Sequence, residues 1–203
     1  MLNDQEIMER VRSGQVEVFD ELVNRHRASM LRAAVSKLRD QAIAEEAVQD
    51  AFLSAFAHRH TYRAEHSFRG WLWTILLNTC RGLARRELGR IDRAGRQPEF
   101  PVSNEPCSSG DALSRLVRAE QAALLFRFLN ELPEAQADAL RLRFFGELKF
   151  DEIAHVMNCS TNGAKQRVRS GLERLSAALR RADVSSIDAH DISGSDRSEG
   201  DNQ

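Results

Sequence analysis

The chain has 203 residues, a formal net charge of -1 and 42% hydrophobic residues, which is ordinary for a globular protein of one or two domains. Residues 183–203 hold six acidic side chains against one arginine, which leaves a charge of +4 on residues 1–182. The three cysteines are odd in number and far apart, which argues against a disulfide framework or a zinc site. No stretch is apolar enough to cross a membrane, so we expect a cytoplasmic protein without membrane insertion.

Apolar residues recur at helical spacing along the chain, and no strand pattern emerges. Asn3 followed by Glu6 is typical of a capping box, and Asp40 can cap the next long apolar segment. Ser67 can cap a helix that runs from Phe68 to about residue 88. The sequence therefore predicts an all-α fold.

The composition changes between residues 87 and 110, where three of the four prolines fall together with several glycines and serines. Such a segment is typical of a mobile linker, and its Cys107 is either a thiol without a role or a redox-sensitive one. We predict two small helical domains, residues 1–88 and 111–182, joined by a flexible linker at 89–110. Residues 183–203 are polar, acidic and rich in serine, so we expect a disordered tail.

The second domain contains a helix-turn-helix pattern between residues 145 and 181. Phe150, Ile153 and Met157 mark the buried face of its first helix, and a short polar turn leads into a basic second helix. We expect Val168, Leu172 and Leu175 to face inward, and Phe144 of the preceding helix to do the same. The residues expected to reach base edges or phosphates lie on the second helix: Thr161, Asn162, Lys165, Gln166, Arg167 and Arg169. The alternative is a helical hairpin that binds protein.

The helix that begins at Phe68 carries both tryptophans of the chain, Trp71 and Trp73, on different faces. Arginines cluster beside and beyond them. An exposed ring among arginines suits single-stranded DNA, because arginines neutralise phosphates while the ring stacks on an unpaired base. The alternative is that both rings fill the core and the arginines keep a helix end soluble.

An acidic strip lies on the predicted helix after Asp40 and consists of Glu45, Glu46, Gln49 and Asp50. It is either a solvated face or a contact for a basic protein partner, because it would repel DNA. No glycine-rich phosphate loop or catalytic motif is present, and His58, His60 and His66 are poorly spaced for a metal. We predict no catalytic activity, metal or cofactor.

In chain order, four segments resemble the extracytoplasmic-function (ECF) family of bacterial RNA polymerase sigma factors: residues 19–26, 44–56, 68–75 and 132–154. The resemblance implies core RNA polymerase, duplex and single-stranded promoter DNA, and an anti-sigma factor as partners. It also implies that the acidic strip binds the polymerase clamp and that residues 161–169 read the minus-thirty-five element. For the minus-ten element it implies contacts from Tyr62, Arg69, Trp73, Asn78, Arg81, Arg85 and Arg86, with the loop at 58–66 capturing a flipped base.

Two features depart from the family pattern. Residues 161–164 read Thr-Asn-Gly-Ala where the family has a Val-Gly-Thr-Val-like run, and Gly171 inside a helix costs about 1 kcal/mol relative to alanine. Two other functions stay open at this stage, a free-standing helix-turn-helix regulator and a protein-binding helical adaptor. Initiation by core polymerase in the presence of the protein distinguishes the sigma factor from both.

Overall fold

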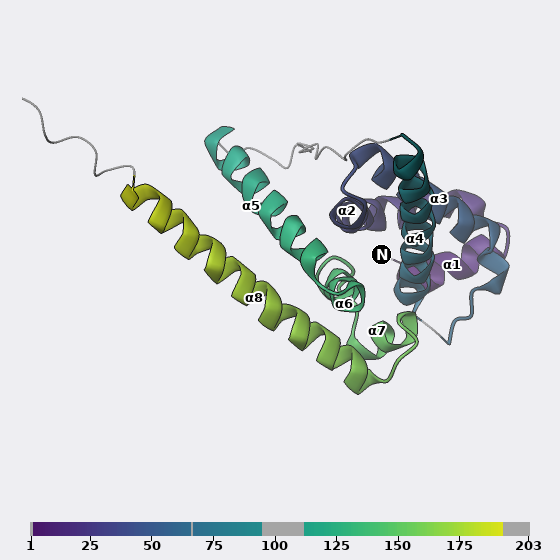
Figure 1. Ribbon diagram of the computed structural model, residues 1–203. Helices are drawn as coiled ribbons and strands as arrows, with labels where there is room; N and C mark the ends of the chain where they lie inside the picture. The colour runs from purple at the N-terminus through teal and green to yellow at the C-terminus, as the bar shows by residue number, and fades with distance from the viewer. Residues whose placement is uncertain (1, 66, 95–111, 193–203) are drawn as a thin grey trace, which may run out of the picture.

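The computed structural model describes residues 2–65, 67–94 and 112–192, and these residues form helices and no strand (Figure 1). The N-terminal domain comprises α1 (Asp4–Arg12), a 3₁₀ turn (Val16–Val18), α2 (Phe19–Leu38), α3 (Gln41–Ala57), a second 3₁₀ turn (Arg59–Thr61) and α4 (Phe68–Ala94). The C-terminal domain comprises α5 (Ala112–Glu131), α6 (Glu134–Phe144), α7 (Phe150–Val156) and α8 (Thr161–Ile192). The prediction of two helical domains is confirmed.

Side-chain caps begin three of the N-terminal helices as the sequence predicts. Asn3 and Glu6 form a capping box on α1, with the Glu6 amide 2.9 Å from Asn3 Oδ1. The Ile43 amide donates to Asp40 at the start of α3, and the Gly70 amide donates to Ser67 Oγ in the first turn of α4. These contacts satisfy amides that have no partner within the helix.

Two helices extend past the expected domain limits. α4 continues to Ala94 rather than ending near residue 88, and α8 continues to Ile192 although a disordered tail was expected from residue 183. The physical reason on α8 is that no proline or glycine interrupts residues 172–193, so helix propagation meets no breaker. Most of the predicted linker and residues 193–203 lie outside the described residues, as does Cys107.

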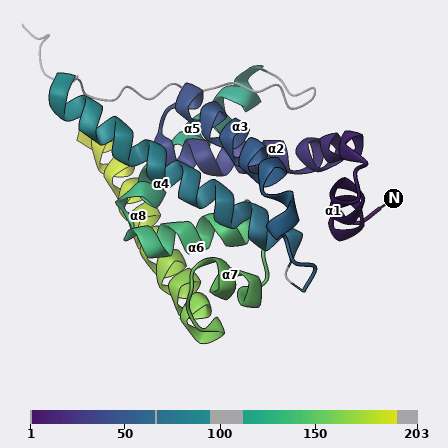
Figure 2. The same ribbon diagram turned by 90° about the vertical axis from the view of Figure 1, so that its right-hand side faces the viewer.

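The two domains pack against each other, which the sequence did not indicate. α5 lies alongside α2, α7 packs against α4, and the Arg81–Asp138 hydrogen bond joins α6 to α4 (Figures 1 and 2). Leu142, Leu148 and Ile153 of the C-terminal domain belong to the same continuous core as the buried residues of α1–α4. We call this contact of α5–α7 with α2 and α4 the interdomain seam.

The polar centre of the interdomain seam is Asp138 on α6, which is fully buried. Its carboxylate accepts hydrogen bonds from Lys37 Nζ at 2.9 Å, Arg81 Nη2 at 3.0 Å and Arg141 Nη1 at 3.1 Å. Lys37 also reaches Glu134 Oε1 at 2.9 Å. We call these five side chains the Asp138 network.

Arg141 ties the C-terminal domain to the end of α2. Its guanidinium donates to the Ser36 hydroxyl at 2.8 Å and to the Ser36 carbonyl at 2.9 Å, and the Asn130 amide donates to the same carbonyl at 2.7 Å. This carbonyl lies in the last turn of α2, where carbonyls have no partner within the helix and the helix dipole favours a cation. Burial lowers the pKa of Arg141, and the Asp138 charge opposes that shift.

The inward face of α6 therefore differs from the prediction. Phe144 was expected inside but is 59% exposed, whereas Arg141 is only 2% exposed. Helical spacing alone favoured Phe144 for the inward position. The interdomain seam instead provides Asp138 and the end of α2 as hydrogen-bond partners for the buried guanidinium of Arg141. A charged side chain can be buried when it is paired and hydrogen-bonded in this way.

Two glycines allow close approach between helices. Gly171 on α8 faces Leu140 of α6, where an added Cβ would come within 3.0 Å of the leucine side chain. This close approach explains the glycine inside the helix. Gly171 takes the inward position, and the neighbouring Leu172, expected inside, is 41% exposed. Gly146 lies under the Trp73 ring, and an added Cβ would also lie 2.7 Å from the Leu142 carbonyl.

These distances predict opposite effects of two alanine substitutions. Gly146→Ala should lower the free energy of unfolding by about 1–3 kcal/mol, because backbone and a buried ring must move. Gly82→Ala, in the interior of α4 with nothing within 4 Å of the added Cβ, should raise it by about 0.5–1 kcal/mol. Urea unfolding followed by circular dichroism measures both. Equal changes in the two variants would contradict the close contact at Gly146.

Candidate functional site

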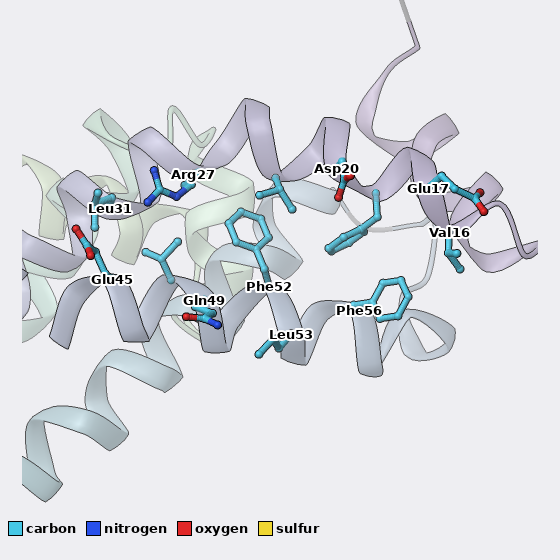
Figure 3. A pocket seen from close by; sticks show the side chains of 13 residues that line it. Val16, Glu17, Asp20, Arg27, Leu31, Glu45, Gln49, Phe52, Leu53 and Phe56 are labelled. Atoms are coloured by element: carbon cyan, nitrogen blue, oxygen red, sulfur yellow. The ribbon is translucent and has the colours of Figure 1, made fainter. Parts of the chain in front are cut away.

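A groove with an apolar floor lies between α2 and α3 (Figure 3). Its volume is about 610 Å³, and its floor is formed by apolar side chains: Val16, Phe19, Val23, Leu31, Val48, Phe52 and Phe56. Leu53 stands at its edge with 59% of its surface exposed. A large apolar side chain left in solvent beside an apolar groove is typical of a protein-binding surface. We call this opening the α2–α3 groove.

The predicted acidic strip forms one bank of this groove. Glu45, Glu46, Gln49 and Asp50 are all exposed on α3, and Glu45 and Gln49 line the groove. Leu53 was not predicted to have a role. The sequence could have indicated Leu53 as part of this surface, because position 53 lies three residues after Asp50 and seven after Glu46 and therefore on the same helix face.

The predicted DNA face of α4 is mostly occupied by the C-terminal domain. Trp73, expected to be available for stacking, has 0% exposure and lies against Gly146, while Trp71 is half-buried. The ring is not exposed in this structure, as in the alternative that it fills the core, because Gly146 and α7 also cover this face; the predicted contact of Trp73 with DNA stays a prediction. The Trp73 indole Nε1 has no hydrogen-bond partner among the described residues.

The basic residues of α4 fall into two groups. Arg81 is paired with Asp138 and with Glu134, and Arg69 lies 3.6 Å from Glu147 Oε2. Asn78, Arg85 and Arg86 are exposed, and Asn78 accepts a hydrogen bond from Arg81. The first group is held by carboxylates of the other domain, and the second remains available to a ligand.

Tyr62 was predicted to contact DNA but is buried, in edge contact with Phe68 and 5.4 Å from the Trp71 ring centroid. Burial raises the pKa of the Tyr62 hydroxyl. The tyrosine forms the base of a cavity of about 610 Å³ that is otherwise lined by loop residues and Arg12 of α1: His60, Thr61, Arg63, Ala64 and Glu65. The buried ring packs beneath the loop, and the predicted contact of Tyr62 with DNA stays a prediction.

The start of α8 projects into solvent. Thr161, Asn162, Lys165, Gln166 and Arg169 are exposed, while Arg167 is half-buried. Arg169 pairs with Glu173 at 2.9 Å, which fixes its guanidinium along the helix surface. α7 and α8 meet at the turn formed by residues 157–160, so the structure confirms the helix-turn-helix pattern. Helix-turn-helix proteins place the first turns of the second helix in the DNA major groove, and in this structure these turns of α8 are exposed.

The cysteines described by the structure have no paired partner. Cys80 is buried in α4, and burial raises the pKa of its thiol to about 11. Cys159 is half-buried at the helix-turn-helix. Across the described ranges, no helix combines the length and apolar character that a membrane span requires.

Comparison with known proteins places both domains in one family. Residues 22–89 match the model of Sigma-70 region 2, and residues 122–175 match that of Sigma-70, region 4. The RNA polymerase sigma-H factor of Pseudomonas aeruginosa is 30% identical over 186 residues, covering 87% of this chain and 93% of that protein. The ECF RNA polymerase sigma-E factor of Escherichia coli is 28% identical over 178 residues, covering 82% and 89%.

Two solved structures share the fold. CnrH in complex with the cytosolic domain of CnrY superposes with a TM-score of 0.66 at 24% identity, over 88% of this chain and 97% of that one. The sigma factor RpoE in complex with the anti-sigma factor NepR from Bartonella quintana gives a TM-score of 0.64 at 21% identity, over 80% and 96%.

These matches, with the two helical domains and the exposed helix-turn-helix, define a transcription initiation factor, a class of protein that is not an enzyme. The chain belongs to the ECF-type RNA polymerase sigma factors, alternative sigma factors that direct transcription initiation.

The two tryptophans make the burial of Trp73 directly measurable. In a Trp71→Phe variant the remaining Trp73 should emit at short wavelength and resist acrylamide, because no part of its ring reaches solvent. In the matched Trp73→Phe variant the half-buried Trp71 should be quenched at least twofold more strongly. Equal quenching in the two variants would contradict the covering of Trp73 by the C-terminal domain.

Proposed function

We propose that this sigma factor docks on core RNA polymerase through the α2–α3 groove and its acidic bank. The single observation that carries the proposal is Leu53, an exposed leucine beside an apolar groove and among Glu46, Gln49 and Asp50. Apolar area that becomes buried on binding contributes about 25 cal/mol per Å². The carboxylates contribute long-range attraction to a basic partner surface and speed the encounter.

The proposal assigns promoter DNA to two other surfaces. The first turns of α8 read the minus-thirty-five element as duplex, with Asn162 and Gln166 suited to base edges and Lys165 and Arg169 suited to phosphates. The face of α4 holds the minus-ten element, with Arg69, Arg81, Arg85 and Arg86 on its phosphates. The polar loop beside Tyr62 receives an unpaired base. The protein acts in the cytoplasm, where its polymerase works.

An anti-sigma factor is the proposed negative regulator. The support is the fold shared with RpoE, which was solved in complex with the anti-sigma factor NepR, and with CnrH, which was solved with the cytosolic domain of CnrY. A regulator that covers the α2–α3 groove would exclude polymerase. Transcription reconstituted from purified chain and core polymerase, with sequencing of transcript starts, tests the function as a whole, and absence of initiation would overturn it.

The polymerase contact is tested by Leu53→Glu, which places a charge where apolar area should be buried. We expect the affinity for core polymerase to fall at least tenfold, equivalent to about 1.4 kcal/mol. Glu46→Arg combined with Asp50→Arg should weaken binding through charge reversal. Ala28→Glu is the matched control, because this exposed α2 position does not line the groove. Competition against a labelled sigma factor measures each affinity, and unchanged binding of Leu53→Glu would contradict the site.

The duplex contact is tested at Asn162. Asn162→Ala should relax the sequence preference at one base pair and cost about 1–3 kcal/mol on the preferred site, because an amide reads a base edge. Arg169→Ala should instead weaken binding to all sequences and reduce its salt dependence. Selection from a duplex library randomised in the minus-thirty-five region, with holoenzyme as bait, separates the two results. An unaltered preference in Asn162→Ala would remove that base contact.

A further inference from the structure

The C-terminal domain presents carboxylates to the cations of the N-terminal domain along the interdomain seam. Asp138 lies 2.9 Å from Lys37 Nζ and 3.0 Å from Arg81 Nη2, and Glu134 lies 2.9 Å from Lys37 Nζ. Glu147 approaches Arg69 at 3.6 Å. A carboxylate oxygen and a phosphate oxygen are equivalent acceptors for an arginine fork. Each of these carboxylates therefore occupies a position where a DNA phosphate would otherwise bind.

The apolar part of the same face is also occupied. Gly146 approaches the Trp73 ring so closely that an added Cβ would lie 3.0 Å from it, and Leu148 and Ile153 belong to the same core as Trp73. DNA that contacted Arg69, Arg81 and Trp73 would need the volume now filled by α6 and α7. The C-terminal domain and the minus-ten strand are therefore alternative ligands of one surface.

The contact is more specific than a pair of surface charges. Asp138 is fully buried and receives three cationic donors, and Arg141 and Asn130 both donate to the Ser36 carbonyl. Removing one partner of a buried, paired charge leaves the others uncompensated, which destabilises that packing strongly. The closed arrangement thus depends on one carboxylate of α6.

Closing the interdomain seam also costs free energy, which favours its reopening. The Trp73 Nε1 group is buried without a hydrogen-bond partner, and the Asp138 network must be desolvated when the domains close. A pocket of about 380 Å³ that is open to solvent borders the same contact and is lined by Lys37, Arg81, Arg85, Glu134 and Arg141 among others, so water can reach the edge of the network.

The closed arrangement leaves the other proposed surfaces free. All the residues that line the α2–α3 groove belong to α2, α3 and the turn before α2, and the first turns of α8 are exposed. The C-terminal domain therefore covers neither of these two surfaces in the closed arrangement.

The geometry points to self-inhibition: the carboxylates of Glu134, Asp138 and Glu147 act as phosphate mimics that hold the C-terminal domain on the minus-ten face of α4 until the domains separate. This inference rests on the proposed DNA role of α4. It assigns Asp138 as the residue on which closure depends, and it makes the free chain a weak ligand for single-stranded DNA.

The test uses the full chain in the Trp71→Phe background, with Trp73 as reporter. Asp138→Asn should open the seam, so acrylamide quenching of Trp73 should rise at least twofold. The dissociation constant for a fluorescein-labelled, random-sequence, twelve-nucleotide single strand should fall at least threefold in fluorescence anisotropy. Lys37→Gln breaks the same contact from the N-terminal domain and should act in the same direction, which keeps the test decisive if Asp138→Asn does not fold. Circular dichroism verifies folding.

Glu131→Gln is the matched control, because this exposed carboxylate is three residues from Glu134 but is not part of the Asp138 network. It should change neither readout. Unchanged quenching in folded Asp138→Asn and Lys37→Gln would overturn the self-inhibition while leaving the proposed function intact. Increased quenching without a gain in DNA affinity would instead overturn the assignment of α4 to DNA. Adding Arg85→Ala and Arg86→Ala to Asp138→Asn should abolish the gain if both proposals hold.

Discussion

The structure depends on how one buried carboxylate is shared between two domains. Asp138 accepts from Lys37 and Arg81 of the N-terminal domain and from Arg141 of its own helix, at distances of 2.9–3.1 Å. Because the buried Asp138 carboxylate cannot be left without its cationic partners, the contact fixes the position of α6 against α2 and α4. The burial of Trp73 and the placement of the helix-turn-helix follow from that position.

In this arrangement one of the proposed binding surfaces is covered by the other domain and two are exposed to solvent. The α2–α3 groove combines exposed Leu53 with an acidic bank, and the first turns of α8 carry polar and basic side chains into solvent. The face of α4 between them is covered. A sigma factor must bind polymerase, duplex DNA and separated DNA strands. In this structure the surface proposed for the separated strands, the face of α4, is the one covered by the C-terminal domain. Covering this face would limit contact with single-stranded nucleic acid before polymerase is bound.

Local signals made much of the fold predictable. Caps at Asn3, Asp40 and Ser67 are short-range contacts between a side chain and a nearby amide, so their sequence pattern is sufficient to place helix starts. The acidic strip and the helix-turn-helix were found by spacing on single helices. Leu172 and Phe144 were misplaced because their orientation depends on which neighbouring helix approaches, and helical period does not specify that neighbour.

The sequence by itself determined the helices, the two domains, the family and the residues of the exposed α3 and α8 surfaces, because each rests on contacts within a few residues or on ordered motifs. Only the tertiary structure decided that Trp73 is covered, that Arg81 is paired with Asp138 and that Arg141 is buried. Arg81 lies 57 residues from Asp138 along the chain, and Arg141 lies 105 residues from Ser36. Contacts across that separation depend on the packing of whole domains, which no local pattern encodes.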